Sequence, residues 1–140
     1  MKDKIFIDTN ILLYLLSNDK VKKTISKEIL GSNYNISTQV LNEFSNISIK
    51  KFKLLIENIK EIIDKISEET TIFIFSKNTI IDALRLKEKY KFQYYDSLIL
   101  ATALENGCTI LYCEDMQHNQ IIENQLKIIN PFLSCQDNQE

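Results

Sequence analysis

Four acidic residues of this chain stand in apolar surroundings, where an ionised carboxylate is costly to desolvate. Asp8 interrupts the apolar run KIFIDTNILLYLL, and Asp96 lies in the otherwise apolar stretch YYDSLILATAL. Glu43 shares an expected helix face with apolar residues three and four positions away. Asp115, with Glu114 beside it, follows the apolar stretch TILYC. These acids are therefore the first candidates for chemistry.

Each of these acids alone has an ordinary structural explanation. Asp8, Asp96 and Asp115 could be helix caps or turn formers, and Glu43 a partly exposed helix residue. Together they indicate a cation site, because two carboxylates about 4 Å apart repel by roughly 4 kcal/mol at an effective dielectric near 20. Converging carboxylates persist if some are protonated or if a cation lies among them. Oxygen ligands without a nearby histidine or thiolate favour Mg²⁺ or Mn²⁺, ions that suit phosphodiester hydrolysis.

Such convergence requires a fold that brings distant segments to one edge. Short apolar runs, read as strands covered on both faces, alternate with segments of helical spacing. The expected strands are residues 4–7, 34–37, 71–75, 108–113 and 127–130. The expected helices are residues 10–16, 20–30, 38–49, 53–66, 76–86 and 94–105. This alternation predicts a three-layer α/β/α domain with a central, mainly parallel sheet of four or five strands, in which strand ends meet at one edge.

Composition places the chain among ordinary globular proteins. It has 140 residues, 44% of them hydrophobic and 26% charged, with two glycines and one proline. We therefore expect a single domain over residues 1–133 and a polar tail over residues 134–140. Three cysteines without CxxC spacing and one histidine do not predict a zinc site. We expect a cytoplasmic protein with free thiols, because three cysteines without paired spacing are typical of a reducing compartment. We expect no membrane segment or signal peptide, because no apolar stretch approaches about 20 residues and Asp8 and Asn10 interrupt the N-terminal apolar run.

The net charge and the helical spacing of apolar residues lead to two further expectations. The net charge of -2 neither indicates nor excludes nucleic-acid binding, and the lysine-rich stretches are typical of solvated helix faces. In the helical stretch that begins at Ser76, spacing predicts that Ile80, Ile81, Leu84 and Leu86 face inward.

Four stretches of the chain resemble the motifs of PIN-domain ribonucleases, and within them the VapC-type toxins of type II toxin–antitoxin systems. The stretches are FIDTNILLY, ISTQVLNEF, KYKFQYYDSLILATALENGCTILYCEDMQH and KIINPF, in the family's order from about Lys4 to Phe132. The resemblance implies a PIN-like fold and a Mg²⁺ or Mn²⁺ site made by Asp8, Glu43, Asp96 and Asp115. It also implies RNA as the substrate, a homodimer and silencing by a VapB-like antitoxin.

The resemblance also implies residues that support the acids. Thr9 and Asn10 follow the first aspartate as in the family pattern and would orient it or bind water. Ser97 and Cys113 are expected beside the acids in the same supporting role. Cys113 departs from the family, which often has threonine or serine two residues before the last aspartate, and a thiol forms weaker hydrogen bonds.

Several residues near the motifs could have either a functional or a purely structural role. Glu114 is the second choice for the position given to Asp115. Arg85 could contact a phosphate and His118 the substrate, although surface positions are the ordinary reading of both. Phe92, Tyr94 and Tyr95 could stack on bases, although packing in the core is the more common role of such residues.

The hypothesis from the sequence is an endoribonuclease that hydrolyses RNA with a metal-activated water. One alternative is an aspartyl-phosphate phosphotransfer enzyme that uses Asp8 as its nucleophile, which leaves Glu43 unexplained. The other is a non-catalytic PIN-like module that binds RNA or a protein, which does not require four mutually repelling acids.

Overall fold

Strand β1 (Ile5–Ile7) lies near the middle of a six-stranded sheet. The structure, a computed structural model, describes residues 2–133, and residues 134–140 of the expected tail lie outside that part of the chain. The sheet order is β3-β2-β1-β4-β6-β5, with β5 antiparallel to β6 and every other neighbouring pair parallel. The remaining strands are β2 (Asn35–Ser37), β3 (Thr71–Phe73), β4 (Ile110–Tyr112), β5 (Ile121–Ile122) and β6 (Leu126–Ile129).

The strands have two to four residues, and the apolar side chains of the central strands are enclosed on both faces. Phe6, Leu111 and Ile128, from three neighbouring strands, have no exposed surface. The five expected strands are confirmed, and β5 is a sixth. The sequence did not indicate β5, because it has two residues and ends in a tight turn where Glu123 and Asn124 adopt positive φ angles of 53° and 57°.

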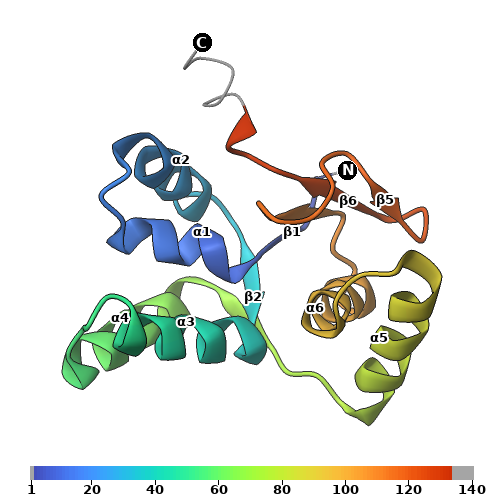
Figure 1. Ribbon diagram of the computed structural model, residues 1–140, viewed down its shortest axis with the longest axis horizontal. Helices are drawn as coiled ribbons and strands as arrows, with labels where there is room; N and C mark the ends of the chain where they lie inside the picture. Colours follow the sequence, from blue (N-terminus) through green and yellow to red (C-terminus); the bar gives the residue numbers. More distant parts are fainter. Residues whose placement is uncertain (1, 134–140) are drawn as a thin grey trace.

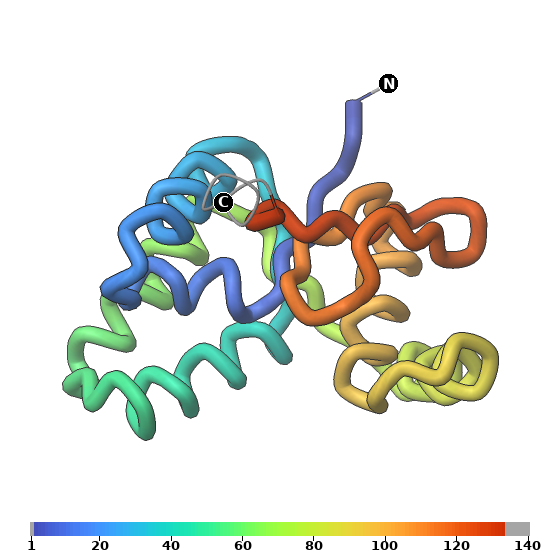
Figure 2. Tube along the Cα trace, turned by 45° about the horizontal axis from the view of Figure 1, so that its top comes forward, coloured from blue at the N-terminus to red at the C-terminus, as the bar shows by residue number. Residues whose placement is uncertain are grey.

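The helices form two groups about the sheet (Figures 1 and 2). The first group, left of the sheet in Figure 1, comprises α1 (Thr9–Leu13), the 3₁₀ turn η1 (Tyr14–Leu16), α2 (Lys20–Leu30), α3 (Thr38–Lys50) and α4 (Ile56–Glu69). The second group comprises α5 (Lys77–Tyr90) and α6 (Tyr94–Glu105), which lie side by side. This confirms the three-layer α/β/α architecture.

Two helices begin directly at the carboxyl ends of neighbouring strands. Asp8 follows β1 and caps α1, its side chain accepting from the Thr9 N–H. Ser37 ends β2 and caps α3, its hydroxyl accepting from the Val40 N–H at 3.3 Å. Because β1 and β2 are parallel neighbours, α1 and α3 leave the sheet at the same edge.

The two helices of the second group differ in how much of their surface is buried. All residues of α6 from Ser97 to Ala103 are buried, as its apolar sequence predicts. On α5, Ala83 and Leu86 are fully buried, but Ile81 and Leu84 are 56% and 53% exposed, so their expected inward orientation is wrong. Helix α5 packs chiefly on α6, with Ile80 partly buried against the core, while Ile81 and Leu84 lie on the outer face.

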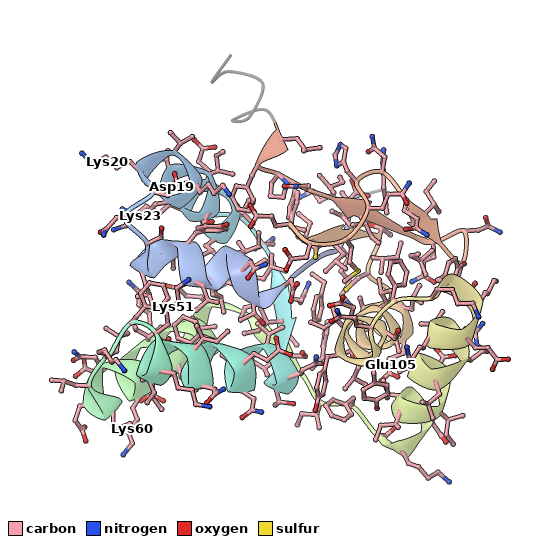
Figure 3. All side chains as sticks on the ribbon, in the orientation of Figure 1. Asp19, Lys20, Lys23, Lys51, Lys60 and Glu105 are labelled. Carbon is pink, nitrogen blue, oxygen red and sulfur yellow. The ribbon has the colours of Figure 1, made fainter. Side chains whose placement is uncertain are left out.

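Charged side chains lie mainly on the outside of both groups. Lys20 of α2 and Lys60 of α4 extend from the outer surface (Figure 3). Over residues 2–133, none of the helices is both long and apolar enough to cross a bilayer. Within the same residues, Cys108 and Cys113 are buried and carry free thiols, while Cys135 lies outside the described part.

Glu123 connects the β5–β6 turn to α5. Its carboxylate accepts from Lys89 and Tyr90 and forms a 2.6 Å ion pair with Arg85. The hydrogen bond from Lys89, followed by those from Tyr90 and Arg85, lowers the pKa of Glu123 from 4.5 to about 2. A lowered pKa means that the ionised carboxylate stabilises the folded state, so this contribution is present above pH 4.5 and is lost as the pH falls through 2.

Glu123→Gln should therefore lower the free energy of unfolding at pH 7 by about 0.2–1 kcal/mol, the range of exposed ion pairs. The difference from wild type should shrink as the pH falls from 4.5 toward 2. Urea titrations over this pH range would measure it, with Glu61→Gln on the exposed face of α4 as the control. A difference that does not change with pH would contradict the assignment.

Candidate functional site

Asp8 is held at the carboxyl end of β1 by its neighbours on two strands. Its backbone N–H donates to the Tyr112 carbonyl of β4 at 3.0 Å. One carboxylate oxygen accepts from the Thr9 N–H at 2.7 Å, and the other accepts from the Cys113 thiol at 3.3 Å. The side chain is only 7% exposed. Both oxygens are thus oriented inside the fold before any ligand binds.

The charges of the other acids act on Asp8. Burial, followed by the negative charges of Glu43 and Asp96, raises the pKa of Asp8 to about 6, although hydrogen bonds from Thr9 and Cys113 act in the opposite direction. Burial also raises the pKa of Asp96, followed by the charges of Asp115 and Glu43. The four acids singled out from the sequence are therefore connected electrostatically, with Asp96 acting on Asp8 and itself affected by Glu43 and Asp115.

Thr9 and Asn10 attach two of these acids to the start of α1. The Thr9 hydroxyl donates to Glu43 Oε2 of α3 at 2.8 Å. The Asn10 amide donates to Asp115 Oδ2, in the segment after β4, at 2.8 Å. The three residues Asp8, Thr9 and Asn10 are consecutive, so one short segment contributes one acid and orients two others.

Gln39 is a buried residue of this site that the sequence analysis did not single out. Its Nε2 donates to Glu43 Oε1 at 3.0 Å and to the Tyr95 carbonyl at 3.1 Å. Both partners are acceptors, which fixes the orientation of the amide. One side chain therefore links Glu43 on α3 to the first turn of α6, where Asp96 lies. The spacing of four residues between Gln39 and Glu43 on one helix could have indicated this contact.

Cys113 and Glu114 differ from their expected roles. The Cys113 thiol supports Asp8, the first acid, rather than Asp115, by donating to the Asp8 carboxylate at 3.3 Å. Glu114 forms a 2.7 Å ion pair with Lys22 and accepts from the Tyr14 hydroxyl. These contacts tie Glu114 to α2 and η1, so Asp115 remains the fourth acid.

Three other candidate residues make contacts that do not involve the four acids of the site. The Ser97 hydroxyl donates to the Gln93 carbonyl of its own helix at 3.0 Å. Arg85 is held by Asp82 and Glu123. His118 Nδ1 accepts from the Asn130 N–H at 3.0 Å. The substrate contacts expected for Arg85 and His118 stay predictions.

The four acids lack positively charged partners among the described residues. None of the ion pairs within residues 2–133 involves Asp8, Glu43, Asp96 or Asp115. As oriented here, no three histidine, cysteine, aspartate or glutamate side chains of that part lie close enough together to hold one ion. Each of Asp8, Glu43 and Asp115 accepts from a protein donor. Metal binding would thus exchange some of these hydrogen bonds for ligation.

The chemistry of the donor set fits a hard divalent cation. All four candidate ligands are carboxylates, which Mg²⁺ and Mn²⁺ prefer over nitrogen or sulfur ligands. Asp8 and Asp96 are driven toward protonation by burial and by neighbouring negative charge, and a cation would relieve both effects. A cavity of about 440 Å³ opens beside Asp96 and Asp115 and provides access to them.

Comparisons with known proteins agree with this arrangement. The family model of the PIN domain matches residues 5–122. No curated protein sequence matches the chain. The fold is similar to a toxin–antitoxin complex from Klebsiella pneumoniae, with a TM-score of 0.70 and 22% identity over 91% of this chain and 98% of that chain.

Two further solved structures share the fold. One is VapC20 from Mycobacterium tuberculosis, a toxin that cleaves the sarcin-ricin loop, with a TM-score of 0.66 and 15% identity over 80% of this chain and 90% of that chain. The other is VapBC2 from Rickettsia felis bound to a promoter DNA fragment, with a TM-score of 0.63 and 20% identity over 89% of this chain and 96% of that chain. At these identities the likeness establishes the fold.

The burial of Asp8 leads to a prediction for stability without metal. A raised pKa means that the ionised carboxylate destabilises the folded state, so the penalty is absent below pH 3.8 and grows as the pH rises through 6. Asp8→Asn should therefore raise the free energy of unfolding at pH 7.5 in EDTA, by an amount on the order of 2–3 kcal/mol.

Thermal unfolding at pH 4 and pH 7.5 would measure this effect. The gain should be largest at pH 7.5 and nearly absent at pH 4. Asp64→Asn, which removes an exposed carboxylate of α4, is the matched control and should change little at either pH. Destabilisation by Asp8→Asn at pH 7.5 would show that the carboxylate is not under electrostatic strain.

Proposed function

The chain belongs to the PIN-domain family, and we propose that it is a Mg²⁺- or Mn²⁺-dependent endoribonuclease and the toxin of a type II toxin–antitoxin pair. The observation that carries the proposal is the convergence of four carboxylates from four segments at one edge of the sheet. Asp8 and Asp96 both feel the charge of Glu43, and Asp96 also feels that of Asp115. A structural ion-pair network would place basic residues among them.

Each residue of the site has a defined part in this proposal. Asp8, Glu43 and Asp96 would hold one ion, and Asp115 would add to it or to a second. The bound ion would lower the pKa of a water molecule and stabilise negative charge on the scissile phosphate. Thr9 holds Glu43 and Asn10 holds Asp115, so the acids are positioned before substrate arrives.

The proposed substrate is single-stranded RNA or an RNA loop. The acids lie at an open edge of the sheet beside a cavity of about 440 Å³ that is lined in part by Lys91, Phe92 and Gln93. Unpaired bases can be splayed out and reached at such an edge, whereas the bases of a duplex cannot. The sarcin-ricin loop cleaved by VapC20, which shares this fold, supports RNA as the substrate class.

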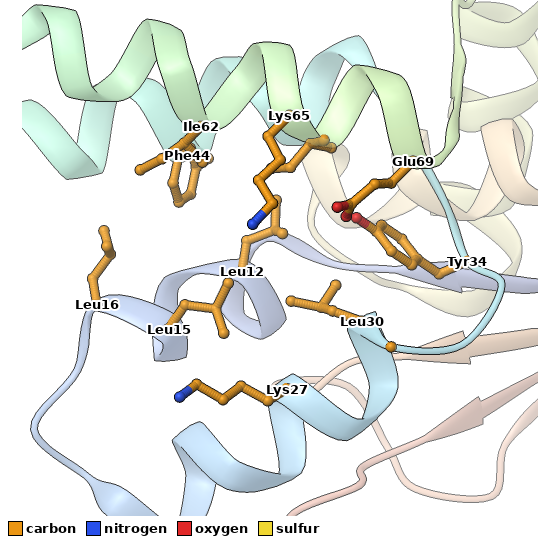
Figure 4. A pocket seen from close by; sticks show the side chains of 12 residues that line it. Leu12, Leu15, Leu16, Lys27, Leu30, Tyr34, Phe44, Ile62, Lys65 and Glu69 are labelled. Atoms are coloured by element: carbon orange, nitrogen blue, oxygen red, sulfur yellow. The ribbon is translucent and has the colours of Figure 1, made fainter.

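The proposed antitoxin would bind an apolar pocket on the other side of α1. The pocket, about 360 Å³, is enclosed by side chains of α1, η1, α2, α3 and α4, including Leu12, Leu16 and Phe44 (Figure 4). Two lysines, Lys27 and Lys65, and one acid, Glu69, also line it, so the charged lining is positive on balance and an amphipathic helix with acidic flanks would complement it. Toxin–antitoxin complexes of this fold from Klebsiella pneumoniae and Rickettsia felis support a protein partner.

A homodimer is also part of the proposal. Ile74, Ile81 and Leu84 are 78%, 56% and 53% exposed on and just before α5. Exposed apolar residues grouped on one element are typical of a surface that another protein covers. A second copy of the chain is the proposed occupant.

The nuclease proposal predicts that Asp8→Asn and Asp96→Asn fold normally and lose at least about 100-fold in Mn²⁺-dependent RNA cleavage, because each removes charge that holds the ion. Cleavage of total RNA by purified protein, with Asp64→Asn as the control that retains activity, would measure the loss. Full activity in either site variant would contradict the assignment.

The same proteins separate the alternatives. A non-catalytic module would bind RNA with no calorimetric signal for Mn²⁺, which would refute the nuclease proposal. A phosphotransfer enzyme would form a beryllofluoride adduct at Asp8. The geometry favours this second alternative less, because Asp8 is buried and both of its oxygens accept hydrogen bonds.

The partner proposal predicts that Leu16→Glu leaves RNA cleavage intact and abolishes neutralisation, because it puts a charge into the apolar pocket. Growth on co-expression with a small protein that neutralises wild type, together with co-purification, would measure the effect. Val21→Glu, at an exposed position of α2 outside the pocket, is the control that should still be neutralised. Tight co-purification of the Leu16 variant would exclude this pocket as the binding site.

A further inference from the structure

A second cavity opens beside the acidic site, between α3 and the first turn of α6. It has a volume of about 570 Å³ and is lined by Gln39, Asn42, Glu43, Asn46, Ile47 and Tyr95. This volume lies within the range of about 300–1,000 Å³ typical of sites for small organic groups. Glu43 forms one wall of the cavity, so whatever binds there lies next to a candidate metal ligand.

The aromatic ring of Tyr95 faces this open space. Tyr95 is 67% exposed, whereas its neighbours Phe92 and Tyr94 are partly buried, so core packing, the ordinary reading from the sequence, is wrong for Tyr95. Its ring meets the Tyr94 ring edge to face at a centroid distance of 5.6 Å. Tyr95 also lines an adjoining cavity of about 390 Å³. The ring therefore has room beside it for a planar group.

The backbone of Tyr95 is fixed although its side chain is exposed. The Tyr95 carbonyl accepts from Gln39 Nε2, the same amide that donates to Glu43. The backbone from which the ring extends is consequently placed relative to Glu43. The ring itself packs on one side against Tyr94.

The polar lining of the cavity suits a base better than a phosphate. None of the residues that line it is lysine or arginine, and Glu43 would repel an anion. Asn42 and Asn46 are exposed, and each amide offers both donors and an acceptor, which match the mixed edge of a nucleobase. The cavity beside Asp96 and Asp115, which shares no lining residue with this one, is lined in part by a cation, Lys91. A phosphate would therefore be favoured in that cavity and a base in this one.

We propose that the cavity lined by Tyr95, Asn42 and Asn46 binds one unpaired nucleobase of an RNA strand, stacked on Tyr95, next to the scissile phosphate. This inference rests on the proposed ribonuclease function. Stacking on an aromatic ring tolerates every base, and the two asparagines discriminate among them. The cavity therefore determines where along a single strand the enzyme cuts.

The test uses short single-stranded RNAs that contain one abasic nucleotide, moved along the strand one position at a time. Binding is measured by fluorescence anisotropy in EDTA, and cleavage is measured separately in Mn²⁺. At one position the missing base should weaken binding by wild type about 5- to 150-fold, the usual effect of losing one stacked base. Tyr95→Ala should weaken binding of intact RNA by a similar factor and should be insensitive to the abasic nucleotide at that position.

Matched variants isolate the ring. Tyr95→Phe keeps the stacking surface and should bind within about twofold of wild type, while Asn42→Ala should change the preferred base at the same position. Leu55→Ala removes a side chain that is 69% exposed outside both cavities and should have no effect. Calorimetry with Mn²⁺ should give the same affinity for Tyr95→Ala and wild type, which separates base binding from damage to the metal site.

The outcomes for the two proposals differ. If wild type cleaves RNA but Tyr95→Ala binds and cleaves equally well, the base site is refuted and the ribonuclease stands. The base site is also refuted if the abasic nucleotide weakens RNA binding by Tyr95→Ala as much as it weakens binding by wild type. If wild type shows no cleavage and no Mn²⁺ binding, yet its RNA binding depends on Tyr95 and on one base, the base site stands and the ribonuclease is refuted.

Discussion

The electrostatic cost of burying Asp8 is the constraint on which this structure depends. A carboxylate with 7% exposure at the end of an apolar strand would be unfavourable in isolation. The fold offsets the cost with a backbone N–H from Thr9 and a thiol from Cys113, and then adds to it by placing Glu43 and Asp96 nearby. An arrangement that concentrates negative charge around a buried acid reduces stability, and such arrangements are typical of functional sites.

The four acids and the fold could be predicted because both are indicated by short, local patterns in the sequence. Continuous apolar runs specify the buried parallel strands, and Asp8 and Asp96 stand out because charge interrupts such runs. No local sequence pattern indicates the contacts that orient the acids. The hydrogen bond from Thr9 to Glu43 joins residues 34 positions apart, and the partner of Cys113 depends on which strand lies beside β4.

Local sequence patterns also do not predict which apolar and aromatic side chains are exposed to solvent. The side chains of Ile81 and Leu84 have the spacing of a core face, yet α5 packs chiefly on α6 and leaves them exposed. Tyr95 stands in a run of aromatic residues that resembles core sequence, and only the position of α6 relative to α3 shows that its ring lies at an open cavity. Both results depend on the arrangement of whole helices.

The pairing of β1 with β4 has a consequence for how the protein is made. Asp8, which directly follows β1, is synthesised about 105 residues before Tyr112 and Cys113, which hold it in place. A nascent chain that has not reached β4 therefore lacks both these contacts and the fourth acid, Asp115. The acidic cluster can therefore form only after β4 and the segment that carries Asp115 have left the ribosome.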